Sequence, residues 1–129
     1  MRGWILVLAG TLMLLSAAAH AGLGWPLMSH GLAEAGAPPD LTRGLATGWL
    51  WGSVSMACFG VILVLYGLRW RRGDRSGAVP ILVVAAGYTV FGAVALALSA
   101  SPHFLLFIAT GLLAGLPVIG GQKSGKVET

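Results

Sequence analysis

Three histidines and one glutamate are the residues in this sequence that could bind a metal ion or a haem. His20 ends one apolar run, His103 begins another, and His30 and Glu34 are four residues apart, which places them on one helical face. Imidazoles and carboxylates bind divalent metals, and two imidazoles could be the axial ligands of a haem. We take all four as candidate metal ligands, and His20 with His103 as the candidate cofactor-binding pair. The alternative is that water or backbone carbonyls satisfy these histidines near a membrane surface, because no fixed spacing ties them together.

The rest of the sequence offers little for catalysis. No Asp, Glu, Lys or Arg lies inside the long apolar runs, and an intramembrane ionisable group is the usual mark of ion-coupled transport. The single cysteine, Cys58, has no C-x-x-C partner, and hydrolase, metalloprotease and phosphate-binding motifs are absent. We expect a protein that is not an enzyme, and nothing in the sequence requires a cofactor.

Composition indicates a membrane protein. Of the 129 residues, 57% are hydrophobic and only 9% are charged, whereas a soluble domain carries about 25% charged residues. Four apolar runs predict helices over residues 4–23, 45–68, 78–100 and 103–120, and about 20 residues are needed to cross roughly 30 Å of hydrocarbon. The expected fold is all-α, an integral membrane four-helix bundle. It forms a single transmembrane domain over residues 1–129 and ends in a short polar cytoplasmic tail over residues 121–129.

The connection between the first two runs is the one long loop. Leu27, Met28, Leu32 and Ala35 recur at helical spacing after Pro26. This first outer loop could therefore hold a short helix that lies flat at the membrane interface.

Lysine and arginine predict the orientation. Seven of the eight lie on one side if both termini are cytoplasmic, and only Arg43 lies on the other. The sequence therefore favours a multi-pass protein of the cell (inner) membrane with N-in and C-in topology. The net charge of +4 is then a topology signal that draws the chain to the lipid bilayer, and we expect no nucleic-acid partner. The seven inward residues are Arg2, Arg69, Arg71, Arg72, Arg75, Lys123 and Lys126.

The first run has a second interpretation. Arg2, an apolar stretch and Ala19-His20-Ala21 together have the form of a signal peptide with an A-x-A cleavage site. We expect the helix to be retained, because its apolar stretch is slightly long for a signal core. Cleavage after Ala21, which leaves three helices, stays as the alternative.

Small residues at regular spacing predict where helices approach closely. One row lies in the second run, and shorter rows lie in the third and fourth. Whether these faces meet the same chain or a homo- or hetero-oligomeric partner is not decided by the sequence. The predicted packing residues are Gly44, Gly48, Gly52, Gly60, Ala93, Ala97, Gly111 and Gly115.

Two functional hypotheses follow. The first is a small, non-catalytic membrane protein that acts through helix–helix association or as an accessory subunit. The alternative is an outer-facing site for a metal, a haem or a small lipophilic molecule, using His20 and His103. Hydroxyl groups at depth, Tyr88 among them, could line a small cavity, although such groups more often bond to a nearby carbonyl.

Overall fold

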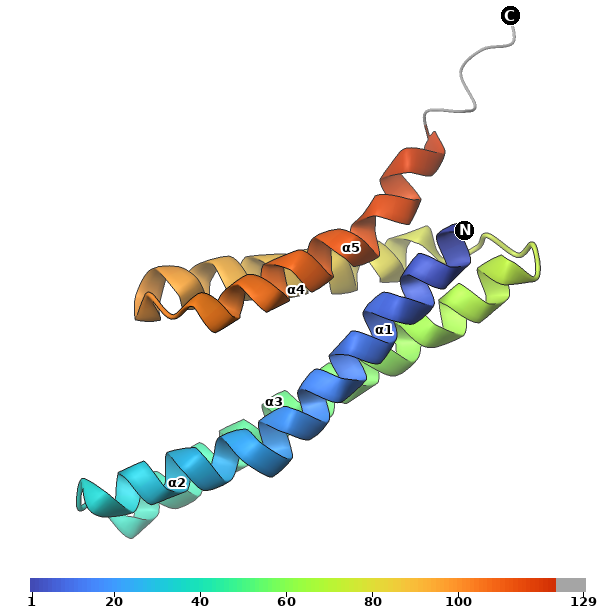
Figure 1. The fold of residues 1–129 in the computed structure, drawn as a ribbon. Coiled ribbons are helices and arrows are strands. Elements are labelled where there is room, and N and C mark those ends of the chain that lie inside the picture. Colours follow the sequence, from blue (N-terminus) through green and yellow to red (C-terminus); the bar gives the residue numbers. More distant parts are fainter. Residues whose placement is uncertain (123–129) are drawn as a thin grey trace, which may run out of the picture.

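The computed structural model describes residues 1–122, and these residues form helices joined by short loops, with no strand among them (Figure 1). The helices are α1 (Arg2–Ala19), α2 (Trp25–Glu34), α3 (Pro39–Arg71), α4 (Ala78–Ser99) and α5 (Leu105–Gln122). A π-helical turn (His20–Gly24) joins α1 to α2, and a 3₁₀ turn (Pro102–Phe104) precedes α5. Most of the predicted polar tail lies outside the described residues.

Within residues 1–122, four helical stretches are long and apolar enough to cross a membrane, which confirms for this part of the chain the all-α prediction and the number of candidate spans. They are Arg2–Glu34, Pro39–Arg71, Ala78–Ser99 and Pro102–Gly120. The first two are longer than the apolar runs, because helix continues into the polar residues on both sides of the connecting loop. The residues of the expected short helix are helical and form α2, but α2 continues α1 through the π-helical turn and is not a separate helix in a loop, so the interfacial position stays a prediction.

The turn between α2 and α3 is set by glycine and proline. Gly36 has a φ of 67°, a left-handed conformation that glycine adopts without strain after a helix. Pro38 is extended, with φ −58° and ψ 142°, as expected for a residue that precedes a proline. Pro39 then begins α3, where its missing N–H costs no hydrogen bond.

The α1–α3 pair is held together by glycines spaced seven residues apart. A Cβ added to Gly10 would lie 2.6 Å from the Gly60 carbonyl oxygen, and one added to Gly3 would lie 2.6 Å from the Gly67 carbonyl oxygen. The two helices therefore touch backbone to backbone in an antiparallel pair. We call this line of contacts, Gly3 with Gly67 and Gly10 with Gly60, the glycine seam. Larger side chains are buried beside it, and Leu6, Met13 and Leu63 are fully buried. Ala17 and Ser53 are also buried and continue the two rows at the same spacing.

The α4–α5 pair uses the same principle with different residues. A Cβ on Gly92 would lie 2.9 Å from the Ile108 backbone nitrogen, and one on Gly111 would lie 2.7 Å from the Ala85 carbonyl oxygen and against Thr89 Oγ1. The Thr89 hydroxyl donates to the Ala85 carbonyl at 2.8 Å, so this polar group is satisfied within its own helix. Pro117 lies inside α5, and Figure 1 shows this helix bending in its last turns.

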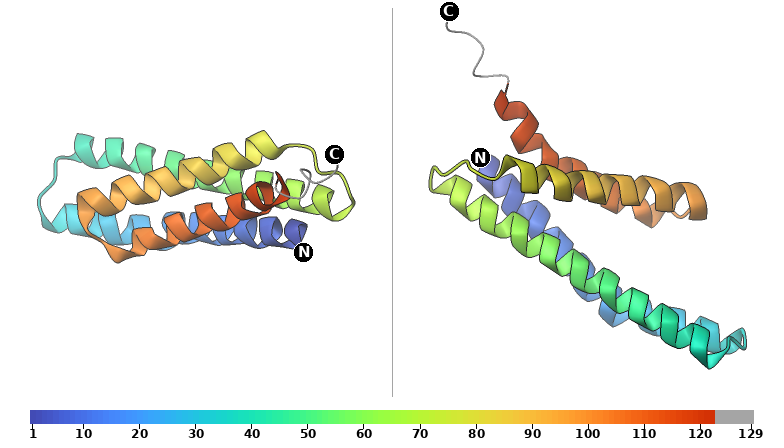
Figure 2. Two further views of the ribbon diagram at one scale, coloured as in Figure 1. Left: turned by 90° about the horizontal axis from the view of Figure 1, so that it is seen from above. Right: turned by 180° about the vertical axis from the view of Figure 1, so that it is seen from behind.

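The two helical pairs meet at one end and diverge at the other (Figure 2). They contact each other mainly through α1 and α5, near the N-terminus of the chain. The far ends of the pairs, near the 3₁₀ turn on one side and α2 on the other, lie apart. Large apolar side chains such as Leu15, Leu65, Val83 and Leu116 face outward from all four stretches, as expected where lipid replaces water around the helices.

The loop of residues 72–77 is fixed by one carboxylate. Asp74 accepts hydrogen bonds from Arg69 Nε at 2.9 Å, Arg69 Nη2 at 2.7 Å and the Ser76 backbone N–H at 3.0 Å. Trp70 Nε1–H donates to the Ser76 carbonyl at 2.9 Å. These hydrogen bonds tie the loop to the last turn of α3, and α4 begins directly after the loop.

These hydrogen bonds predict an unusually acidic carboxyl group. Donation from Ser76, by its side chain and then its backbone, and from Arg69 lowers the pKa of Asp74 from 3.8 to about 2. Because the folded pKa is the lower one, the stability that Asp74 contributes is present above pH 3.8 and is lost as the pH falls through about 2. We expect an NMR titration of the carboxyl to show this value, and Ser76→Ala to move it back toward 3.8. An unshifted carboxyl in the unmodified protein would contradict the loop geometry.

Candidate functional site

A cleft of about 470 Å³ lies between the two helical pairs, on the side where they diverge. Its lining comes from the π-helical turn and α3 on one side, and from α4, the 3₁₀ turn and α5 on the other. Both candidate cofactor-binding histidines, His20 and His103, lie in this lining although they are remote in the sequence. The other lining residues are Trp49, Gly52, Ser55, Met56, Phe59, Gly87, Tyr88, Phe91, Phe104 and Phe107.

His20 is held by a tryptophan from α3. Its ring is stacked on Trp49 with a centroid distance of 4.1 Å and an interplanar angle of 4°. Trp49 Nε1–H donates to the His20 backbone carbonyl at 2.7 Å. The indole can take this position because of Gly24, where an added Cβ would lie 2.7 Å from Trp49 Cζ2. His20 also begins the π-helical turn, a type of irregularity that is frequent at functional sites.

His103 is oriented by a serine from the turn that precedes α5. Its Nδ1 lies 2.7 Å from the Ser101 hydroxyl, and its ring lies 4.0 Å from that of Phe104. Within residues 1–122 its other ring nitrogen, Nε2, makes no hydrogen bond. That nitrogen is therefore available to a molecule in the cleft.

Tyr88 is the most deeply buried polar side chain in the lining of the cleft. It is only 5% exposed, its ring is stacked on Phe107 at 5.4 Å, and Phe59 meets its edge at 6.3 Å. Its hydroxyl is covered and has no hydrogen-bond partner within the described residues. A buried polar group without a partner costs about 1–3 kcal/mol. The site therefore carries an unmet hydrogen bond among aromatic rings.

The remaining candidate metal ligands lie elsewhere. His30 Nδ1 is 3.7 Å from Glu34 Oε1, both side chains are largely exposed, and neither lines the cleft. Within residues 1–122, no group of three or more His, Cys, Asp or Glu side chains is placed to hold a metal ion. The structure therefore brings His20 and His103 to one cleft and leaves His30 and Glu34 as an exposed pair.

The predicted packing residues fall into different environments. Gly60, Gly111 and Gly115 are buried between helices of this chain. Gly52 lines the cleft, where an added Cβ would be 3.5 Å from His20 Nε2. The others face outward: an added Cβ meets nothing within 4 Å at Gly44 and Gly48, and Ala93 and Ala97 are exposed.

Sequence reasoning named Tyr88 as a residue that could line a small cavity, but it missed the other aromatic residues of the cleft and the seven-residue glycine rows. Tyr88 and Phe91 are three residues apart on α4, and Phe104, the last residue of the 3₁₀ turn, has the same spacing to Phe107 in α5. Each pair therefore lies on one helical face, and the tight turn between α4 and α5 brings the two faces together. That spacing was the signal that could have located the cleft.

Over the described residues 1–122, these features define an all-α fold with four helices long and apolar enough to cross a membrane, and with an aromatic cleft between two helical pairs. No family model, no curated protein and no solved structure matches the chain.

Proposed function

We propose that this is a small multi-pass membrane protein that binds a lipophilic molecule with a flat, polar-rimmed ring in the cleft between its helical pairs. The observation that carries this proposal is the meeting of His20 and His103 in one aromatic cleft. Small-molecule sites are typically about 300–1,000 Å³, mostly apolar, and equipped with a few convergent polar groups. A cleft of about 470 Å³ with two imidazoles and a tyrosine fits that description.

The chemistry of the lining favours a flat ring with oxygen acceptors at its edge. Trp49, Phe91, Phe104 and Phe107 offer aromatic faces and edges, against which a planar ring stacks favourably. A ligand oxygen near His103 would accept or donate at Nε2, and a small shift of Tyr88 would give its hydroxyl a partner. Isoprenoid quinones have this combination of a flat ring, rim oxygens and an apolar tail, and the tail would leave through the open side of the cleft into lipid.

The test is to identify what the cleft holds. The purified protein is extracted with organic solvent for mass spectrometry, and its absorption spectrum is recorded. We expect a co-purifying lipophilic ring compound that is depleted in His20→Ala and His103→Ala, with a quinone-type ultraviolet band. A haem spectrum that is lost in both variants would show that the cleft is the binding site and that its ligand is a haem. A colourless protein that carries no such compound and binds no added short-chain ubiquinone would overturn the proposal.

For orientation, we infer that both termini are cytoplasmic and that the protein resides in the inner membrane. Basic residues support this, because Arg2 from α1 and Arg71 and Arg75 from the α3–α4 region lie around one pocket at one end of the bundle. Arg43, near the start of α3, is the exception, and it pairs with Asp40. Helical spans are typical of inner membranes, whereas outer membranes use barrels. Lys123 and Lys126, counted in the same prediction, lie outside the described residues.

The same topology places α2 at the outer surface. The stretch Arg2–Glu34 has 33 residues, which corresponds to about 50 Å of helix, longer than the roughly 30 Å of hydrocarbon. We place α2 and the first turns of α3 in the outer headgroup region, where the exposed pairs His30–Glu34 and Asp40–Arg43 meet water. The cleft then opens toward the outer leaflet.

Association with another chain is the second candidate function, and a specific observation favours it. Gly44 and Gly48 are exposed, and a Cβ at either position would meet nothing in this chain. Rows of small residues let a helix of another chain approach closely. Such a contact would use the outer part of α3 and would leave the α1–α3 seam unchanged.

Gly48→Leu tests this candidate. A side chain that stands between two helices prevents close approach, so we expect the variant to lose self-association, or binding of a partner, in lipid bilayers. Energy transfer between differently labelled copies measures the first. Cys58 is exposed and is the single cysteine, so it serves as the labelling site. Equal energy transfer in the variant and the unmodified protein would rule out association through this face and would not bear on ligand binding in the cleft.

A further inference from the structure

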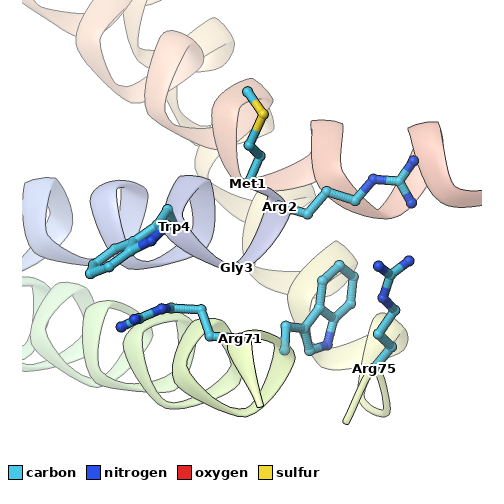
Figure 3. A pocket seen from close by; sticks show the side chains of 7 residues that line it. Met1, Arg2, Gly3, Trp4, Arg71 and Arg75 are labelled. Carbon is cyan, nitrogen blue, oxygen red and sulfur yellow. The ribbon is translucent and has the colours of Figure 1, made fainter. Parts of the chain in front are cut away.

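A second pocket lies at the opposite end of the molecule, where the helical pairs meet. Its volume is about 250 Å³, and its lining comes from the start of α1, the end of α3 and the following loop. Figure 3 shows Arg2 and Arg75 extending to the same side of this pocket, whereas Arg71 turns toward Trp4. The side chain of Trp70 is also part of the lining.

The floor of this pocket is closely packed. Gly3 lies where the α1 and α3 backbones touch, since an added Cβ would be 2.6 Å from the Gly67 carbonyl oxygen. The Arg71 guanidinium lies 3.7 Å from the Trp4 ring centroid in a cation–π contact. Trp70 is fixed by its hydrogen bond to Ser76. The two tryptophans therefore hold the walls of a pocket whose charge comes from arginine.

The positive charge in the pocket is unbalanced within the described residues. Asp74 is engaged by Arg69, Asp40 pairs with Arg43, and Glu34 lies beside His30. Within residues 1–122, no carboxylate pairs with the arginines of the pocket, and no acidic residue lines it. Arg2 uses one Nη2–H, which donates to the Gly120 carbonyl at 2.9 Å. Its other N–H groups remain for a ligand, and guanidinium groups favour anions with planar or tetrahedral oxygens.

We propose that Arg2 and Arg75 bind a phosphate group in this pocket, and that the phosphate belongs to the headgroup of an anionic phospholipid. Trp4 and Trp70 support the lipid source, because tryptophans gather at the level of the headgroups. Basic pockets between membrane helices bind anionic headgroups in the same way. A free phosphate compound shares this chemistry and is the other source that the experiment must separate. The proposal does not depend on the identity, or the existence, of a ligand in the cleft.

The experiment compares two arginines that are near neighbours in the chain. Arg75→Gln and Arg72→Gln each remove one charge from the same loop, but Arg72 does not line the pocket. Binding of phosphatidylglycerol, with phosphatidylcholine as the neutral reference, is measured by native mass spectrometry and by titration in mixed micelles. We expect Arg75→Gln and Arg2→Gln to weaken phosphatidylglycerol binding about tenfold or more, as for loss of a charge-assisted hydrogen bond. We expect Arg72→Gln to change it less than twofold, and thermal unfolding checks that all three variants are folded.

Inorganic phosphate and glycerol phosphate distinguish the sources. If neither competes at millimolar concentration, the lipid headgroup is the ligand, as proposed. If inorganic phosphate binds with the same dependence on Arg75 but not on Arg72, and phosphatidylglycerol does not, the pocket is a phosphate site and the lipid assignment is wrong. Equal weakening in Arg75→Gln and Arg72→Gln, or no saturable preference for phosphatidylglycerol over phosphatidylcholine, would show diffuse attraction to the membrane surface and would overturn the site.

Discussion

Gly10→Leu will force α1 away from α3 and destabilise the first helical pair by about 1–3 kcal/mol. The reason is that an added Cβ would lie 2.6 Å from the Gly60 carbonyl oxygen and 2.9 Å from the Val64 backbone nitrogen. Backbone atoms cannot swing aside as a side-chain end can, so the whole helix must move. That movement separates Leu6 and Met13 from Leu63, and all three are fully buried.

The measurement is unfolding of the purified protein on titration from a mild detergent into dodecyl sulfate, followed by circular dichroism. Gly44→Leu is the matched control, because it makes the same substitution on α3 where nothing lies within 4 Å of the new Cβ. Gly10→Ala should give a smaller loss in the same direction, since its single methyl meets the same backbone atoms. Equal transitions for Gly10→Leu and Gly44→Leu would mean that the glycine seam does not hold the pair together.

The seam also shows which part of the packing could be predicted from the sequence. Small residues were expected to mark close contacts, and Gly60 and Gly111 lie in such contacts. The predicted row in α3 has four-residue spacing, which suits helices that cross at an angle. The α1–α3 pair runs nearly antiparallel over many turns, and its contacts repeat every seven residues, at Gly3 with Gly67 and Gly10 with Gly60. Spacing alone does not say which geometry applies, because that depends on the partner helix.

The helix boundaries show a different limit. Apolar runs predict the part of a helix that lies in lipid, and they located all four candidate spans. They do not predict where helix continues in polar sequence, as it does through the π-helical turn into α2 and from Pro39 into the apolar part of α3. In that region the two helices continue beside each other, and Trp49 bridges to His20. Contacts between neighbouring helices therefore extend the helices beyond what hydropathy indicates.

Only part of the candidate site could be predicted from the sequence. His20 and His103 stood out as the polar groups at the ends of two apolar runs, and the structure places both in one cleft. Their aromatic neighbours did not stand out, because phenylalanine is ordinary in a membrane helix. What makes Phe91 and Phe107 unusual is that they face each other across a hairpin, with ring centroids 5.2 Å apart. The three-residue spacing puts each aromatic pair on one helical face, and the pairing of α4 with α5 is what brings the two faces together.

Gly52→Leu will block the cleft and lower its affinity for a short-chain ubiquinone by at least about tenfold. A Cβ at this position lies 3.5 Å from His20 Nε2, which is an ordinary contact, so the helix need not move. The rest of the leucine side chain must then enter the space that the ring would occupy. Gly48→Leu is the matched control, because it lies one turn away on α3 and meets nothing within 4 Å. Binding is followed by quenching of tryptophan fluorescence, with Trp49→Phe identifying the contribution of the cleft.

Tyr88→Phe separates a binding role from a structural one. Removing a hydroxyl that is buried without a partner should raise the stability of the ligand-free protein by about 1 kcal/mol. If a ligand oxygen supplies the missing partner, the same substitution should weaken ubiquinone binding, so that stability and affinity change in opposite directions. Such a conflict is expected where a polar group is retained for function at a cost in stability. A Tyr88→Phe variant that gains stability and binds ubiquinone as well as before would remove the tyrosine from the site. Equal ubiquinone affinity in Gly52→Leu and Gly48→Leu would show that the cleft is not the binding site.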